Sequence, residues 1–276
     1  MKGNSYQRRL LSIVAVLCCL SSWAHASTRD IPYQFHPGLR ISHTKPPTIR
    51  ELTGLMRELS SLSGLPLKVD EVGKIYYDPK LPAVGGSAIA RELLLKAIDS
   101  SDSFTVESAN DSAQVAFAQI ESTMTYKDGS SPWHNVWVIR IDFADFAQLR
   151  GDDTALKTFN PGMNMMHELT HAIIRLPDPE GTNDRLGQCE RYVNLMRAEL
   201  GLPLRQYYFP KTSLARSPAS LSQILQGELK FTHGDPRTKR AEESSLTFNI
   251  EMVVDTQKVK SKTSIPSDLF AMASKQ

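Results

Sequence analysis

Cysteine is scarce in this 276-residue chain, which contains three. Two of them, Cys18 and Cys19, lie in an apolar stretch near the start, so Cys189 is the only one in the remaining chain. A single cysteine cannot form an internal disulfide, and the fold must therefore depend on its hydrophobic core, with or without a metal. Cys189 falls on the apolar stripe of an expected helix, which favours a small buried hydrophobic residue over a nucleophile.

Long hydrophobic runs are also lacking, apart from the segment Leu10–Leu20. Basic residues precede this run, and Ala24-His25-Ala26 follows it with small residues at the two positions that a signal peptidase reads. We therefore expect residues 1–26 to be a signal peptide that is cleaved before Ser27, and the mature protein to be secreted or periplasmic. The alternative is an N-terminal anchor that stays attached, although the run is short for a membrane span.

Net charge of either sign is small. The formal charge of the chain is +2, and removing a signal with three basic and no acidic residues leaves −1. This balance excludes an electrostatic case for nucleic acid or for an anionic membrane as a partner of the mature form. A hydrophobic content of 41% and a charged content of 22% are typical of a globular protein.

Hydrophobic periodicity predicts an α+β fold. We expect an extended arm over residues 27–47, one domain over 48–257 and a polar tail over 258–276. Thr48 and Ser87 are expected to cap helices. Strand patterns cover residues 104–107, 115–120 and 136–143, and a last alternating run covers 246–254. The strand over 136–143 is either an ordinary core strand or an edge along which a peptide docks.

The most informative motif is His167-Glu168-Leu169-Thr170-His171, on a helix expected to begin at Asn160-Pro161 and to end before Pro177. Histidines four residues apart project from the same side of a helix. This spacing lets both imidazoles bind one zinc ion, with Glu168 beside them as the general base that takes a proton from a zinc-bound water. The sequence therefore predicts a catalytic Zn²⁺ site.

A catalytic zinc site needs a third protein ligand and an open position for water. Glu190 is the favoured third ligand, on a following helix expected to run from Thr182 or Asn183 to Leu200. Asn194, one turn further on, is expected to orient a ligand. The alternative third ligands are the loop acids Asp178, Glu180 and Asp184.

The segment His167 to Ala172 resembles the active-site helix of thermolysin-like peptidases, and Glu190 followed by Asn194 is similar to their glutamate ligand and the acidic residue after it. The helix Met166–Ile173, the run from Asn194 to Tyr208 and, more loosely, residues 90–101 resemble the NleD-like family of bacterial effector zinc peptidases. This second resemblance implies a compact gluzincin-like, zincin-like fold and endopeptidase activity. Those effectors are injected without a signal peptide, so their delivery and host substrates are not carried over.

An oxyanion that develops on the scissile carbonyl needs a donor besides zinc. Tyr208 and His233 are the leading candidates, with Tyr207 and Arg205 as further ones.

We therefore expect an exported zinc metallopeptidase that acts on a protein or peptide. One alternative is an exported binding or interaction protein with a structural or relic zinc site, which four protein ligands would favour. Another is metal-assisted hydrolysis of a substrate that is not a peptide.

Overall fold

The computed structural model describes residues 35–110, 112, 114–127, 129–181, 184–216, 223–234 and 241–250. The chain divides into the units Met1–Phe35 and His36–Gln276, and all the helices and strands that follow belong to the second unit. The expected signal peptide and the expected polar tail over 258–276 lie outside the described residues. The mixture of helices and strands confirms the α+β class.

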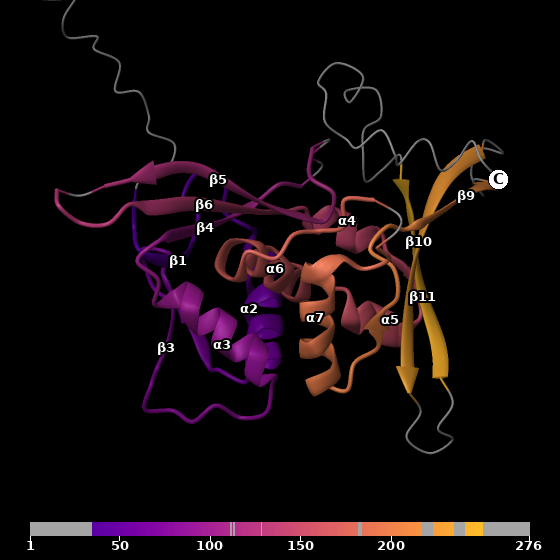
Figure 1. Ribbon diagram of the computed structural model, residues 1–276, viewed down its shortest axis with the longest axis horizontal. Coiled ribbons are helices and arrows are strands. Elements are labelled where there is room, and N and C mark those ends of the chain that lie inside the picture. Colours follow the sequence, from indigo (N-terminus) through magenta and orange to yellow (C-terminus); the bar gives the residue numbers. More distant parts are fainter. Residues whose placement is uncertain are drawn as a thin grey trace, which may run out of the picture. The chain divides into compact units, whose positions relative to one another are not determined.

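The larger core is built on a four-stranded sheet in the order β1-β4-β6-β5, which lies above the helices in Figure 1. Strands β1 (Gly38–Ile41), β4 (Ser103–Ser108) and β6 (His134–Ile141) are parallel, and β5 (Ala118–Tyr126) is antiparallel to β6.

One expectation about this sheet is wrong, and one alternative that the sequence left open is decided. The arm over 27–47 contains the fully buried strand β1, because the short run Gly38–Ile41 pairs with β4 rather than extending away from the domain. Strand β6 cannot be a docking edge, since β4 and β5 occupy both of its sides. The alternative of a core strand is confirmed for it, and β5 is the strand at the edge of the sheet.

Two capped helices pack below this sheet. Helix α2 (Ile49–Ser63) begins with a capping box between Thr48 and Glu51, and α3 (Ala88–Ile98) begins at the Ser87 cap. These starts are as the sequence predicts, because a hydroxyl there accepts a hydrogen bond from an otherwise unpaired backbone N–H. Between them lies a short hairpin of β2 (Leu67–Val69) and β3 (Ile75–Tyr77), which the sequence did not indicate.

The helix of the histidine motif is in two parts. Helix α6 (Pro161–Leu169) starts at the Asn160 cap, as predicted, and continues as the π-helical turn η1 (Thr170–Ile174). The following helix α7 (Gly187–Glu199) starts later than expected; Thr182 and Asn183 lie outside the described residues. In Figure 1, α6 and α7 lie in the middle of the ribbon.

A second sheet forms from the C-terminal part of the chain. Its order is β7-β11-β10-β8, and β9 pairs with β10. It packs with a separate apolar cluster that includes Phe117, Phe159, Leu229 and Phe248. The sequence predicted β11 in part and none of the other elements here, which are α4 (Phe143–Gln148), β7 (Arg150–Gly151), α5 (Asp153–Thr158), β8 (Leu204–Arg205), β9 (Lys211–Arg216), β10 (Gln223–Gly234) and β11 (Ala241–Asn249).

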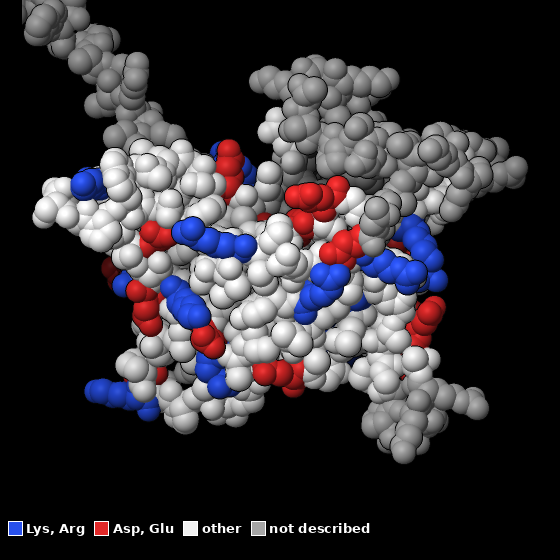
Figure 2. Space-filling view, in the orientation of Figure 1, with Lys and Arg blue, Asp and Glu red and all other residues white. Residues whose placement is uncertain are grey.

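The charged side chains are mixed on the face shown in Figure 2, where basic and acidic residues alternate over the helices. Within the described part of the chain, no helix is both long enough and apolar enough to cross a membrane.

The close crossing of α2 and α6 generates a stability prediction. A Cβ added at Gly162 would lie 2.7 Å from Cβ of Glu58, whereas one added at Gly54 would meet nothing within 4 Å. Gly162→Ala should lower the free energy of unfolding by about 1–3 kcal/mol. Gly54→Ala should raise it by about 0.5–1 kcal/mol. Urea unfolding measures both, and a stabilising Gly162→Ala would contradict the packing described.

Candidate metal centre

Helix α6 and its π-helical turn present two imidazoles to one point. The ring centroids of His167 and His171 are 4.7 Å apart, and the two Nε2 atoms are 3.0 Å apart. His171 Nδ1 donates to the carbonyl oxygen of Leu176 at 2.7 Å, which leaves its Nε2 as the nitrogen that could bind a metal ion. The π-turn contains the second histidine, His171, and such turns often occur at functional sites.

Asp178 completes a three-residue group with these histidines. Its Oδ1 is 3.2 Å from Nε2 of His167, and its Oδ2 is 3.2 Å from Nε2 of His171. The ligand atoms of a tetrahedral zinc ion lie about 3.3 Å apart, so these distances fit one shared ion. In addition, Asp178 Oδ1 is buried without a well-aligned hydrogen-bond donor among the described residues. A cation between these atoms would satisfy it.

The chain reverses sharply to bring Asp178 back over the histidines. Arg175 adopts a left-handed conformation with φ of 62° and ends the π-turn. The carbonyl of Pro177 then accepts a hydrogen bond from the N–H of Cys189 at 3.1 Å. Gly187 has φ of 70°, and a Cβ there would lie 2.5 Å from Cδ of Pro179. Only glycine therefore lets the loop pack this closely against the start of α7.

Glu190 meets His167 from the opposite side of the ring. Its Oε2 is 3.1 Å from Nδ1 of His167, and its carboxylate also pairs with Arg197 and, at 3.2 Å, with Arg205. Glu190 and Arg197 are almost completely buried. A carboxylate on Nδ1 orients the ring and increases the basicity of Nε2.

The geometry therefore favours Asp178 over the predicted Glu190 as the third ligand. The structure places Asp178 beside the two Nε2 atoms and Glu190 on Nδ1 of His167, outside the group of converging ligand atoms. The potential ligand atoms of His167, His171, Asp178 and Cys189 all lie within 4.8 Å of one another, so these four residues could hold a metal ion. Asp178 was among the alternatives from the sequence. Cys189 was expected to be a buried hydrophobic residue, and it is fully buried.

The carboxylates change the pKa of both histidines. Burial disfavours the charged imidazolium, but hydrogen bonding with Asp178 and the nearby Cys189 sulfur raises the pKa of His171 to about 10. Burial likewise opposes the rise at His167, where Asp178, Cys189 and Glu190 hold the pKa well above its ordinary value. Burial would raise the pKa of Asp178, yet the two histidines lower it. The group thus binds positive charge, which a metal ion can supply in place of protons.

Glu168 lies beside this group and faces a cavity of about 400 Å³. The same cavity is lined by His167 and Asp178. Burial raises the pKa of Glu168, while the two imidazoles lower it in part. A carboxylate with a raised pKa at an open cavity is suited to accept and return a proton.

Among the predicted oxyanion donors, Tyr208 is the one whose side chain contacts the group formed by His167, His171 and Asp178. Its hydroxyl donates to Asp178 Oδ2 at 2.6 Å, and its ring stacks on His167 with centroids 6.0 Å apart. Burial and the Asp178 carboxylate raise its pKa, so the hydroxyl keeps its proton. Arg205 also lines the cavity, but its guanidinium donates to Glu190 and to the carbonyls of Tyr207 and Tyr208.

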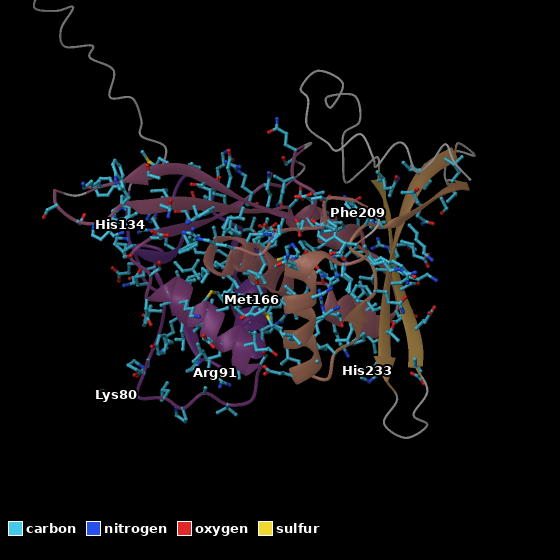
Figure 3. All side chains as sticks on the ribbon, viewed as in Figure 1. Lys80, Arg91, His134, Met166, Phe209 and His233 are labelled. Carbon is cyan, nitrogen blue, oxygen red and sulfur yellow. The ribbon has the colours of Figure 1, made fainter. Side chains whose placement is uncertain are left out.

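The other sequence candidates are elsewhere. His233 does not line the cavity, and Figure 3 shows it near the lower end of β10, well below Phe209, which does. It is four residues from the lining residue Leu229, or about 13 Å along a strand. The structure therefore does not bring His233 to this cavity. Asn194 bonds the backbone of Arg205 and the side chain of Arg197, so it supports the arginines rather than a ligand.

Comparison of the chain with protein-family models, with curated proteins and with solved structures gave no match. The assignment of a function therefore depends on the chemistry of the residues themselves.

The buried ion pair between Arg197 and Glu190 can be tested by stability. Arg197→Met leaves the Glu190 carboxylate buried with one cation fewer, and we expect the free energy of unfolding to fall by about 3–5 kcal/mol. The control is Arg191→Met on the same helix, whose partner Asp184 is solvent-exposed. That change should cost less than about 1 kcal/mol. Equal losses in the two variants, measured by urea unfolding, would show that the buried pair has no special role.

Proposed function

We propose that the protein is a zinc-dependent metallopeptidase with His167, His171 and Asp178 as its metal ligands. The observation that carries this proposal is the convergence of two Nε2 atoms and one carboxylate, 3.0–3.2 Å apart, at a cavity that Glu168 also lines. Two imidazoles and a carboxylate are a common ligand set for catalytic zinc, and the cavity leaves room for water and substrate.

Bound zinc would lower the pKa of a water molecule and polarise the scissile carbonyl. The chain itself supplies the proton transfers. Glu168 accepts the proton of the attacking water and delivers it to the leaving amine, for which its buried position and raised pKa are suited. Glu190, held by two arginines, keeps His167 in the orientation that directs Nε2 at the metal.

Tyr208 has two roles in this proposal. Its hydroxyl fixes the Asp178 carboxylate, to which it donates at 2.6 Å. Because Tyr208 also lines the cavity and stays protonated, its single hydroxyl proton can turn from Asp178, which a bound metal ion would then neutralise, to the oxyanion that forms on the substrate.

Strand β5 offers a place for an extended peptide. It is the edge of the first sheet, and among the described residues no strand pairs with its outer side. It begins at Ala118, which lines the cavity, so a peptide paired with β5 would run past Glu168. This arrangement supports a zincin-like fold, and with the residues quoted above it supports kinship with NleD-like peptidases. Export through a signal peptide remains part of the proposal.

A second candidate function follows from Cys189. Its sulfur belongs to the group of four residues whose ligand atoms lie within 4.8 Å of one another. If Cys189 binds the ion as a fourth protein ligand, the site is closed and the zinc is structural, as in an exported binding protein. Against this, Cys189 does not line the cavity, and its thiol donates to the carbonyl of His167 at 3.5 Å.

The role of Glu168 generates the functional prediction. Glu168→Gln keeps the size of the side chain but cannot accept a proton, so the rate of peptide hydrolysis should fall by about a hundredfold to ten-thousandfold. Zinc content should stay at the wild-type level. The control is Glu180→Gln, an exposed carboxylate in the loop after the motif, which should leave the rate unchanged.

Cleavage of a peptide library is followed by mass spectrometry, and zinc by elemental analysis. Hydrolysis by Glu168→Gln at the wild-type rate would contradict the assignment of the base. No cleavage by zinc-loaded wild-type protein would favour the second candidate.

A further inference from the structure

The cavity beside Glu168 is polar on one side and apolar on the other. Its polar side is formed by His167, Glu168 and Asp178. The opposite side consists of hydrophobic residues from the second core, among them Phe117, Phe159, Leu229, Phe248 and Ile250. The one arginine in the lining, Arg205, is already paired with Glu190 and with two carbonyls. The apolar side therefore offers no charge to recognise an acidic or basic side chain.

Phe117 forms part of this wall in an unusual backbone conformation. Its φ is 63°, a region that bulky residues rarely adopt, and the N–H of Ala118 donates to the carbonyl of Ala116 at 2.8 Å across it. The side chain of Asp145 and the backbone of Asp142, both in the α4 region, hold the turn. The N–H of Phe117 donates to Asp145 Oδ2 at 2.9 Å, and its carbonyl accepts from the N–H of Asp142 at 2.9 Å. Strain that is held in this way beside a cleft is typical of functional positions.

The ring of Phe117 is fixed as firmly as its backbone. It makes edge contacts with Phe159 and Phe248, at 5.1 Å in each case, and with Phe146 at 5.2 Å. Phe159 and Phe248 line the cavity, whereas Phe146 does not. The ring therefore stands as a rigid wall whose position depends on the turn, and it limits the size of any group that enters from the Glu168 side.

We propose that this cavity receives a large apolar side chain of the peptide, from a residue adjacent to the bond that is cleaved, and that Phe117 sets its specificity. The inference rests on the proposed function, because that function places the substrate beside the proposed metal ligands His167, His171 and Asp178. Apolar burial supplies the affinity, and the absence of an unpaired charge on the wall excludes acidic and basic side chains.

The test uses hydroxamates of glycine, aspartate, leucine and phenylalanine, which bind zinc through a common group and differ in the side chain. Their affinities for the zinc-loaded protein are measured by calorimetry. We expect the leucine and phenylalanine compounds to bind about tenfold or more tightly than the glycine and aspartate compounds, from burial of the side chain. Equal affinities across the four would overturn the inference.

Variants locate the effect at Phe117. Phe117→Ala should shift the preference toward larger side chains, so that tryptophan hydroxamate gains relative to leucine hydroxamate. Phe146→Ala is the matched control, because it removes a ring from the same aromatic cluster without changing the cavity wall. The same shift in both variants would overturn the role of Phe117.

Ala116→Leu keeps the test valid if Phe117→Ala does not fold. Ala116 lines the cavity and is exposed, so leucine there should fill the cavity without disturbing the core. It should weaken the phenylalanine compound about tenfold and leave the glycine compound unchanged. Unchanged binding of both would count against the inference.

The outcomes also separate the two proposals. Binding with the expected preference, but with no peptide cleaved, would overturn the proposed hydrolysis and leave the apolar site in place. Cleavage of peptides without side-chain preference would overturn the apolar site and leave the proposed hydrolysis in place. No binding of any hydroxamate to the zinc-loaded protein would overturn both.

Discussion

The hydrogen bond between His167 Nδ1 and the buried carboxylate of Glu190 joins the two helices on which the site is built. It fixes the ring of His167, and with it the direction of Nε2. Glu190 is in turn held by Arg197 from its own helix and by Arg205 from β8. Arg205 continues the chain of contacts to the backbone of Tyr208, whose hydroxyl reaches Asp178. Four separate segments therefore depend on one carboxylate that we do not expect to touch the metal.

The site also lies where two hydrophobic cores meet. The first sheet and its helices supply His167, His171 and Glu168, and the second core supplies the apolar wall of the cavity. The loop through Pro177 and Asp178 closes over the histidines because it is bonded to the start of α7. Ligand pockets occur preferentially at interfaces between packed units of this kind.

Local features of this fold could be predicted from the sequence because their causes are local. The caps at Thr48, Ser87 and Asn160 and the common face of His167 and His171 depend on residues within one or two helical turns. Spacing along a helix cannot tell which ring nitrogen a carboxylate will meet, so the sequence alone favours Glu190 as a metal ligand.

The errors have non-local causes. The return of Asp178 depends on the left-handed Arg175 and on the close approach at Gly187, which arise from packing between segments. Strand β1 forms because it pairs with β4. The paired residues Gly38 and Ser103 are more than sixty positions apart in the sequence. The strands of the second sheet also pair with distant partners. In addition, they carry polar residues between the few buried ones, so their hydrophobic pattern is weak. Residue type alone suggests His233 as an oxyanion donor, because its position in the sequence carries no information about the site.

The most direct test of this account is the metal content of the wild-type protein, Asp178→Ala and Cys189→Ser after dialysis, measured by elemental analysis. We predict one zinc ion per chain in the wild type and in Cys189→Ser, and its loss in Asp178→Ala. That result would establish an open site with two histidines and one aspartate. Zinc retained by Asp178→Ala, or lost from Cys189→Ser, would contradict it and would favour a closed, structural site.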